Sequence, residues 1–331
     1  MFKRPRLSAT NRLVNALPWL ALLFLASACS DPGQEAANPP SAPVETTTEE
    51  EQAQGLSLPA VWSTNGLDSP IANLGVAGEL GSTVAVTFED GGLQFFNFEG
   101  DLITEKAALN AHLVANGRYL MLSGVPVTLF PGTDQDGQMK IYIHGGQLPE
   151  PLAYDLDIGQ TGAVAGLCTA KPEAEIDGVL RLAFWTEDAP ETLISGRIVE
   201  VLDELVFLAD EPVSADQPIT ACRLDEAAAT VFSAPARAAV SLERRGRTTQ
   251  LLLDTSGNYS VLEDAGITKP LTIRDGITVL APELPVDMAG TGDARSGGYP
   301  GGILVIAGED KNGDHRIVYI DPSDLTLGAF E

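Results

Sequence analysis

The stretch TVAVTFEDGGLQFFNF, residues Thr83–Phe98, decides the fold class of this chain. Two runs rich in β-branched and aromatic residues enclose EDGG, a polar, glycine-containing segment of the kind that forms tight turns. The stretch is therefore predicted to form a β-hairpin. Short runs of the same type recur through residues 56–331, separated by turn sequences such as DQDGQ and DTSGN, and little of this region reads as a long amphipathic helix.

The recurring runs follow one another without a linker and at the spacing of propeller blades. Residues 56–331 are therefore predicted to form one all-β domain, a β-propeller. Paired β-sandwiches are the main alternative, because they are also built from short strands and frequent turns. The repeat is weak at the level of single residues, so the pattern alone supports only the all-β class.

A second hairpin is predicted at IAGEDKNGDHRIVYID, residues Ile306–Asp321, because Asn-Gly between apolar runs is a strong hairpin signal. Asp310, Asn312 and Asp314 also occupy alternate positions, as the ligands of a helix-loop-helix calcium site do. Such a site needs flanking helices and a glycine at the position of His315, whereas the flanks here are β-rich. The segment is interpreted as a turn, and its spacing alone does not establish calcium binding.

The N-terminal residues have the pattern of an export signal. Four basic residues and no acid precede an apolar run at Leu17–Ala26, which is too short to span a bilayer. The run ends in LASAC, which resembles the lipobox of bacterial lipoproteins and implies cleavage after residue 28 and lipidation of Cys29. The alternative is an ordinary signal peptide cut near Ala28, with Cys29 incidental.

The segment after the lipobox is predicted to be a disordered tether. Residues 29–55 are rich in Pro, Ala, Thr and Glu and nearly free of bulky apolar side chains, so they cannot bury enough surface to fold. Their extended reach is on the order of 80 Å at roughly 3 Å per residue. Since Ser30 rather than aspartate follows Cys29, the resemblance implies anchoring in the outer membrane of a bacterial cell envelope, facing the periplasm or the exterior.

The charge of the chain limits its partners. All 46 acidic residues but only 16 of the 20 basic residues follow Cys29, which gives this part a net charge of −30. A chain this acidic is expected to avoid nucleic acid and anionic lipid surfaces, to touch the membrane through its lipid only, and to attract cations. The simpler interpretation of the charge is solubility in a salty medium.

Two cysteines, Cys168 and Cys222, remain after Cys29 is assigned to the lipid. An even pair in an exported protein predicts a disulfide bond between them. Two isolated buried thiols are the alternative.

Several phrases of the chain, taken in order, resemble β-propeller phytases. GGLQFFNFEGDLI at Gly91–Ile103 is similar to the phrase that closes their first blade. GLC at Gly166–Cys168 and ITACRLDE at Ile219–Glu226 follow the order of their third and fourth blades, and GGYPGGILVIAGED at Gly297–Asp310 looks like their closing blade. The resemblance spans most of the region from residue 62 to residue 321, and it rests on the order of these phrases together with the cysteine pair.

The resemblance implies a six-bladed, monomeric propeller related to the calcium-dependent 3-phytases, which hydrolyse phosphomonoesters of myo-inositol hexakisphosphate. In that family carboxylates hold calcium ions, and these ions neutralise the polyanionic substrate and activate a water molecule. Calcium is therefore the implied cofactor. An inositol phosphate or another small anionic ligand is the implied partner.

The acidic cluster of that family is only partly present. Asp225 and Glu226 match it and are the candidate metal ligands, whereas Thr220 and Leu224 stand where the family has carboxylates. FSAP, at residues 232–235, replaces an aromatic residue followed by paired glutamates. Each missing carboxylate removes a hard oxygen ligand, so catalysis is expected to be impaired or lost.

Other residues could rebuild the site from neighbouring blades. Glu89, Asp90 and Asp293 are the further candidate ligands, and Lys171 lies near the place of a phosphate-binding cation, although a lone lysine is more often a solvated surface charge. Two functions stay open: a phytase-like phosphohydrolase with weak or no activity, and a non-catalytic propeller that serves as a binding or scaffold module at the cell envelope.

Overall fold

A computed structural model of the chain describes residues 56–145, 148–159, 162–172, 178–225, 228–263, 266–294 and 298–327. The chain divides into two compact units, Met1–Glu51 and Gln52–Glu331, and the described residues belong to the second unit. The predicted signal peptide, Cys29, the tether and Glu226 lie outside the described residues. In the part that is described, no helix is long and apolar enough to cross a membrane.

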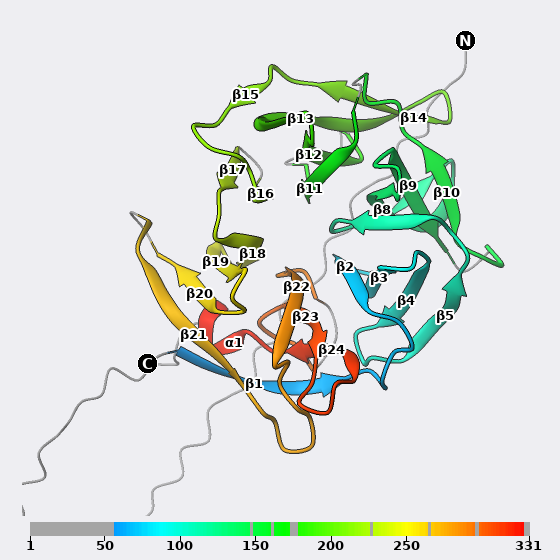
Figure 1. The fold of residues 1–331 in the computed structure, drawn as a ribbon. Coiled ribbons are helices and arrows are strands. Elements are labelled where there is room, and N and C mark those ends of the chain that lie inside the picture. Colours follow the sequence, from blue (N-terminus) through cyan, green and yellow to red (C-terminus); the bar gives the residue numbers. More distant parts are fainter. Residues whose placement is uncertain are drawn as a thin grey trace, which may run out of the picture. The chain divides into compact units, whose positions relative to one another are not determined.

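The described part is all-β, and its strands fall into six groups along the chain (Figure 1). Group 1 is β2 (Ile71–Ala77), β3 (Thr83–Phe88), β4 (Leu93–Asn97) and β5 (Leu102–Ala107). Group 2 is β6 (Ala111–Val114), β7 (Arg118–Leu122), β8 (Val125–Asp134), β9 (Met139–His144) and β10 (Leu152–Asp155). Group 3 is β11 (Val164–Ala170), β12 (Leu180–Thr186), β13 (Ala189–Val201), β14 (Glu204–Ala209) and β15 (Val213–Ser214).

The remaining groups complete the domain. Group 4 is β16 (Ala221–Leu224) and β17 (Ala229–Phe232). Group 5 is β18 (Ala236–Arg244), β19 (Arg247–Asp254), β20 (Tyr259–Leu262) and β21 (Thr268–Arg274). Group 6 is β22 (Leu284–Thr291), β23 (Ile303–Glu309), β24 (His315–Ile320) and, at its edge, β1 (Leu56–Ser63), and the short helix α1 (Ser323–Thr326) follows β24.

The two hairpins that the sequence predicts are confirmed. Thr83 of β3 pairs with Asn97 of β4, and Leu304 of β23 pairs with Ile320 of β24, both in antiparallel register. At the first turn Gly91 and Gly92 have φ of 83° and 102°, a left-handed conformation that glycine adopts without strain.

The first described strand, β1, pairs with two strands near the end of the domain. β1 pairs antiparallel with β24, so that Ala60 lies opposite Ile320, and it also pairs parallel with β21, where Leu56 lies opposite Leu271. Groups 5 and 6 are thereby joined through β1 into one eight-stranded sheet. Residues from the two ends of the domain therefore have to come together before this sheet is complete.

The groups contact one another in a closed cycle. The first strands of successive groups, β2, β6, β11, β16, β18 and β22, each contact the next, and β22 contacts β2. Clusters of buried hydrophobic side chains lie between groups 1 and 2, 2 and 3, 3 and 4, 5 and 6, and 6 and 1. Burying this apolar surface stabilises the fold by on the order of 25 cal/mol per Å². Between groups 4 and 5 the described residues form no such cluster.

Candidate functional site

Two adjoining cavities lie along the first strands of the groups. The first, of about 210 Å³, we name the Asp287 cavity, and the second, of about 470 Å³, we name the Lys171 cavity. Both are lined by Asn116, Thr169, Leu224 and Ser241, so the two cavities share a wall. Because strands from most of the groups contribute to these walls, the cavities are a place where side chains from distant parts of the sequence meet.

Asp287 on β22 is buried in the wall of the smaller cavity. Its Oδ2 accepts hydrogen bonds from Asn73 Nδ2 and from the Leu74 backbone N–H, both at 2.7 Å. Burial raises the pKa of Asp287 to about 7, against the N–H donors of Leu74 and Met288 and the charge of Arg237, which lower it. The group is therefore a carboxyl that exchanges its proton near neutral pH.

Asparagine side chains continue this polar network between strands. Asn73 Oδ1 accepts the N–H of Val114 at 2.8 Å, which links β2 to β6. Asn116 Oδ1 accepts the N–H of Val76 at 2.9 Å, and Asn116 Nδ2 donates to the carbonyl of Gly290 at 3.0 Å. A buried polar group is costly unless it is hydrogen-bonded, so these pairs fix the spacing of β2, β6 and β22.

Basic side chains are concentrated at the two cavities. Of the 16 basic residues after Cys29, six line them: Arg118, Lys171, Arg223, Arg237, Arg244 and Arg245. Among the described residues five acids line them: Glu79, Asp225, Glu243, Asp287 and Asp293. The walls thus carry about as many basic as acidic groups, in a part of the chain whose net charge is −30. The proportion of basic groups is therefore higher at the cavities than in the rest of the chain, which suits an anionic ligand.

Arg244 is a basic residue whose guanidinium is held in place at the Lys171 cavity. Its Nε donates to the carbonyl of Pro300 at 3.0 Å, and its Nη1 donates to the carbonyl of Gly292 at 3.1 Å. Within the described ranges no carboxylate forms an ion pair with it. Carbonyl oxygens orient the guanidinium and carry no full negative charge, so Arg244 presents a positive charge to the Lys171 cavity.

Lys171, the candidate phosphate-binding cation, does line this cavity. Its Nζ pairs with Glu79 and lies 3.9 Å from Asp293 Oδ2. The simpler alternative from the sequence is a solvated lysine, and the side chain is half exposed. The structure therefore places Lys171 at the cavity but between two carboxylates, which reduce its attraction for an anion.

The predicted metal ligands are only partly brought together. Asp225 and Asp293 both line the Lys171 cavity. Asp225 Oδ1 accepts the N–H of Ala228 at 2.7 Å, and its Oδ2 lies 3.7 Å from Arg223 Nη1. Asp225 therefore caps the turn between β16 and β17. Both of its carboxylate oxygens already face donors or a cation of the protein.

Glu89 and Asp90 do not reach this cavity. They belong to the turn between β3 and β4 and are exposed. Asp90 forms an ion pair with Lys106 at 2.7 Å and accepts the hydroxyl of Ser69 at 3.1 Å. The Lys106 ammonium is the main cause that lowers the pKa of Asp90 below its ordinary value. These two carboxylates are part of a separate surface turn.

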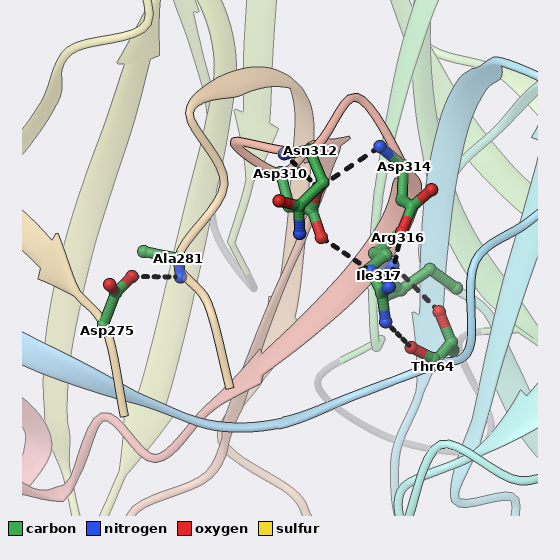
Figure 2. Close-up of polar contacts among 8 residues, drawn as sticks. All are labelled: Thr64, Asp275, Ala281, Asp310, Asn312, Asp314, Arg316 and Ile317. Atoms are coloured by element: carbon green, nitrogen blue, oxygen red, sulfur yellow. Dashed lines mark hydrogen bonds and ion pairs between the residues drawn. The ribbon is translucent and has the colours of Figure 1, made fainter. Parts of the chain in front are cut away.

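The acidic turn at Asp310 is held by the protein's own donors, as Figure 2 shows. Asp310 Oδ1 accepts the backbone N–H groups of Asn312 at 2.8 Å and Asp314 at 3.2 Å, and Arg316 Nε lies 2.9 Å from Asp310 Oδ2. Burial acts to raise the pKa of Asp310, but these N–H donors and Arg316 together lower it. The interpretation as a hairpin turn is confirmed.

The same capped turn recurs in other groups, at positions where the sequence predicts turns but not their aspartate caps. Asp134 Oδ1 accepts the N–H groups of Asp136 and Gln138, and Asp254 Oδ1 accepts those of Ser256 and Asn258. The signal was present as Asp followed three residues later by glycine. These aspartates serve the backbone of β-turns. In the described portion no three His, Cys, Asp or Glu side chains lie where they could hold one metal ion.

Cys168 on β11 and Cys222 on β16 are joined by a disulfide bond, with 2.06 Å between the sulfur atoms and 5.8 Å between the Cα atoms. The bond ties group 3 to group 4. Both cysteines also line the Asp287 cavity, so the bond fixes one of its walls.

Comparison with known proteins yields no family. No family model and no curated protein matches the chain. Among solved structures, it is similar to BBS1N in a complex with ARL6DN (TM-score 0.44, 11% identity, 80% of this chain and 96% of that one). It is also similar to Chaetomium thermophilum Raptor (TM-score 0.44, 8% identity, 83% of this chain and 30% of that one) and to AofleA from Arthrobotrys oligospora (TM-score 0.47, 10% identity, 78% and 90%).

Proposed function

We propose that this chain is a lipid-anchored protein of the bacterial cell envelope whose phytase-like, six-bladed β-propeller binds a small anionic ligand and does not hydrolyse it. The observation that carries the proposal is the gathering of six basic side chains around the two cavities of an otherwise strongly acidic chain. An inositol phosphate is the ligand class that the family resemblance suggests.

Six blades are supported by the closed cycle of contacts among six first strands. Each group packs on two neighbours in this cycle, whereas the sheets of a sandwich pack as pairs. β1 adds a further strand to group 6 beside β24 and also pairs with β21 of group 5, so residues far apart in the sequence join the last groups of the cycle. These features favour a propeller over paired sandwiches.

Binding without hydrolysis is supported by the surroundings of the carboxylates. Calcium takes six to eight oxygen ligands, and several of these are carboxylate oxygens. Four of the five carboxylates at the two cavities are engaged otherwise: Asp225 with a backbone N–H, Asp287 with Asn73 and Leu74, and Glu79 and Asp293 with or near Lys171. In the described part of the chain, no three acidic, His or Cys side chains lie where they could hold one metal ion. The described residues therefore do not fit a calcium cluster that could activate a water molecule for hydrolysis.

The test is calorimetric titration of the full mature protein in detergent with myo-inositol hexakisphosphate, in calcium-free buffer. We expect saturable binding, and we expect Arg244→Gln to weaken it by at least about tenfold, because a hydrogen bond to a charged group contributes about 1.5–3 kcal/mol. Glutamine keeps a donor for the Gly292 and Pro300 carbonyls. Arg197→Gln is the matched control, since Arg197 is exposed and lines neither cavity. Equal affinities of all three proteins, or no binding, would contradict the proposal.

A further inference from the structure

Group 4 has fewer strands than its neighbours. Among the described residues it contains only β16 and β17, whereas β11–β14 precede it and β18–β21 follow it as sheets of four strands in series. Phe232 ends β17 and Ala236 begins β18, so the chain leaves no room for another strand between them. Figure 1 shows no strand beyond β17 on the side away from β16. As far as the described strands go, β17 is therefore an open edge, and a two-stranded sheet is marginal by itself.

The register shows which backbone groups of this edge are unpaired. The Asp225 N–H donates to the carbonyl of Ala228 at 3.0 Å, so these two residues form a hydrogen-bonded pair. Further along the two strands, Arg223 lies opposite Thr230 and Cys222 lies opposite Val231. Backbone groups alternate in direction along an antiparallel strand. Ala229 and Val231 thus direct their N–H and C=O groups away from β16. Such groups pair readily with another extended chain.

A groove lies next to this edge, where groups 4 and 5 meet. It has a volume of about 850 Å³, and its walls come from the end of β17 and from β19, β20 and β21. Phe232, Pro235, Leu252, Tyr259 and Pro270 give it apolar surface. This is the same junction at which the described residues form no hydrophobic cluster. The groove therefore offers space and apolar surface where group 4 lacks the outer strands that its neighbours have.

We infer that β17 accepts an extended segment of a partner protein as a third strand, with alternate side chains entering the groove, and that this segment is basic. Main-chain hydrogen bonds provide affinity in this mode of recognition, and the pockets for alternate side chains provide specificity. The charge follows from the segment between β14 and β16, whose short strand β15 pairs with β13 of group 3. Ala215 in this segment packs on the same cluster as Val231. Its exposed charged residues Asp210, Glu211 and Asp216 are all acidic.

Other occupants fit this edge less well. A second copy paired through β17 would bring two acidic 210–217 segments towards each other, and like charges in that position are repelled. The chain's own residues 29–55 contain acidic residues and no basic residue, so they would meet the same repulsion. A basic segment of another protein is the occupant that charge complementarity favours.

The test uses the full mature protein and a fluorescein-labelled peptide of alternating Lys and Val, followed by fluorescence anisotropy. We expect saturable binding, weakened at least about tenfold when alternate peptide residues are N-methylated, because N-methyl groups remove the main-chain donors that give β-augmentation its affinity. The Val231→Pro variant removes the outward N–H of the edge and should weaken binding similarly. Leu80→Ala, at an exposed position in group 1 away from this edge, is the control and should bind as the wild type does.

The peptide and variant measurements together can support or overturn the inference. The N-methylated peptide tests the binding mode even where Val231→Pro disturbs folding. Equal binding of both peptides would show attraction by charge alone and would overturn the inference, as would undiminished binding to a folded Val231→Pro variant. Tighter binding of an alternating Glu-Val peptide would overturn the charge argument. A dimer in light scattering that Val231→Pro abolishes would assign the edge to a second copy instead.

Discussion

At the scale of single residues, Asp287 is the side chain whose surroundings have the clearest consequence. Its carboxyl is buried between β22 and β2 and has a pKa of about 7, whereas the ordinary value is 3.8. Between pH 3.8 and about 7, this carboxyl is therefore protonated in the folded state and ionised in the unfolded state. The stabilisation from this group is fully present below about pH 4 and is lost as the pH rises through about 7.

This reasoning predicts the pH dependence of an Asp287→Asn variant. Asparagine keeps an oxygen for the Leu74 N–H and carries no charge, so the variant should gain stability relative to the wild type as the pH rises from 4 to 8. The gain is on the order of 4 kcal/mol at 1.36 kcal/mol per pKa unit. Denaturant unfolding of both proteins across this range measures the difference. A difference that does not change with pH would show that Asp287 is ionised throughout.

At the scale of elements, the first strands approach one another too closely for side chains at certain positions. A Cβ added to Gly75 on β2 would lie 2.3 Å from the carbonyl oxygen of Ala115. Gly66 offers a comparison, because a Cβ there would lie 3.7 Å from the nearest side-chain atom and its backbone is not left-handed. A side chain at Gly75 would therefore clash with backbone atoms, which cannot move away easily, whereas a side chain at Gly66 would make an ordinary contact.

Gly75→Ala should therefore destabilise the domain by about 1–3 kcal/mol, the usual cost of overpacking a core. Gly66→Ala should change stability by less than about 0.5 kcal/mol, as surface substitutions do. Urea unfolding of the two variants beside the wild type tests this. Equal stability of both variants would mean that β2 can move away from residue 115, against the close packing of these strands.

The disulfide bond connects two further elements, β11 and β16, across 54 residues of sequence. In the entropic model a loop of this length stabilises the folded state by on the order of 4 kcal/mol, because it restricts the unfolded chain. Replacing both cysteines with alanine should lower the free energy of unfolding by about this amount. Reducing the wild type should have a similar effect, and recovery of two free thiols from unreduced protein would exclude the bond.

At the scale of the whole molecule, the proposed anchor determines where the domain works. The apolar run that ends in LASAC predicts a lipid on Cys29, so Cys29→Ala should release the exported protein or leave it as uncleaved precursor. Membrane fractionation and mass spectrometry of the N-terminal peptide measure both. Unchanged processing and unchanged membrane association in the variant would rule out the lipid.

Local signals in the sequence predicted local structure well. The hairpins at Thr83–Phe98 and at Asp310, and the pairing of Cys168 with Cys222, depend on neighbouring residues or on a count of cysteines. Turn chemistry acts over four or five residues, which is why it can be read directly. The all-β class followed from the same signals.

Features that depend on distant residues could not be read in this way. Arg118, Arg223, Arg237 and Arg244 are scattered over the sequence, and only the contacts among the first strands bring them to the two cavities. The sequence offered Asp90 and Asp293 alike as candidate ligands, but Asp90 pairs with Lys106, 16 residues further on, in a separate surface turn. The open edge of β17 depends on how the strands pair into sheets, which no local signal in the sequence specifies.

The central claim is that the domain binds a small anionic ligand and does not hydrolyse it, and phosphate release tests this most directly. The full mature protein is incubated with myo-inositol hexakisphosphate, with calcium and with a chelator, beside a β-propeller phytase as a positive control. We predict no calcium-dependent release of phosphate above the level without enzyme, under conditions where calorimetry detects binding. Sustained calcium-dependent release by the wild type would contradict the account, because it would require a metal-activated water that the described carboxylates do not provide.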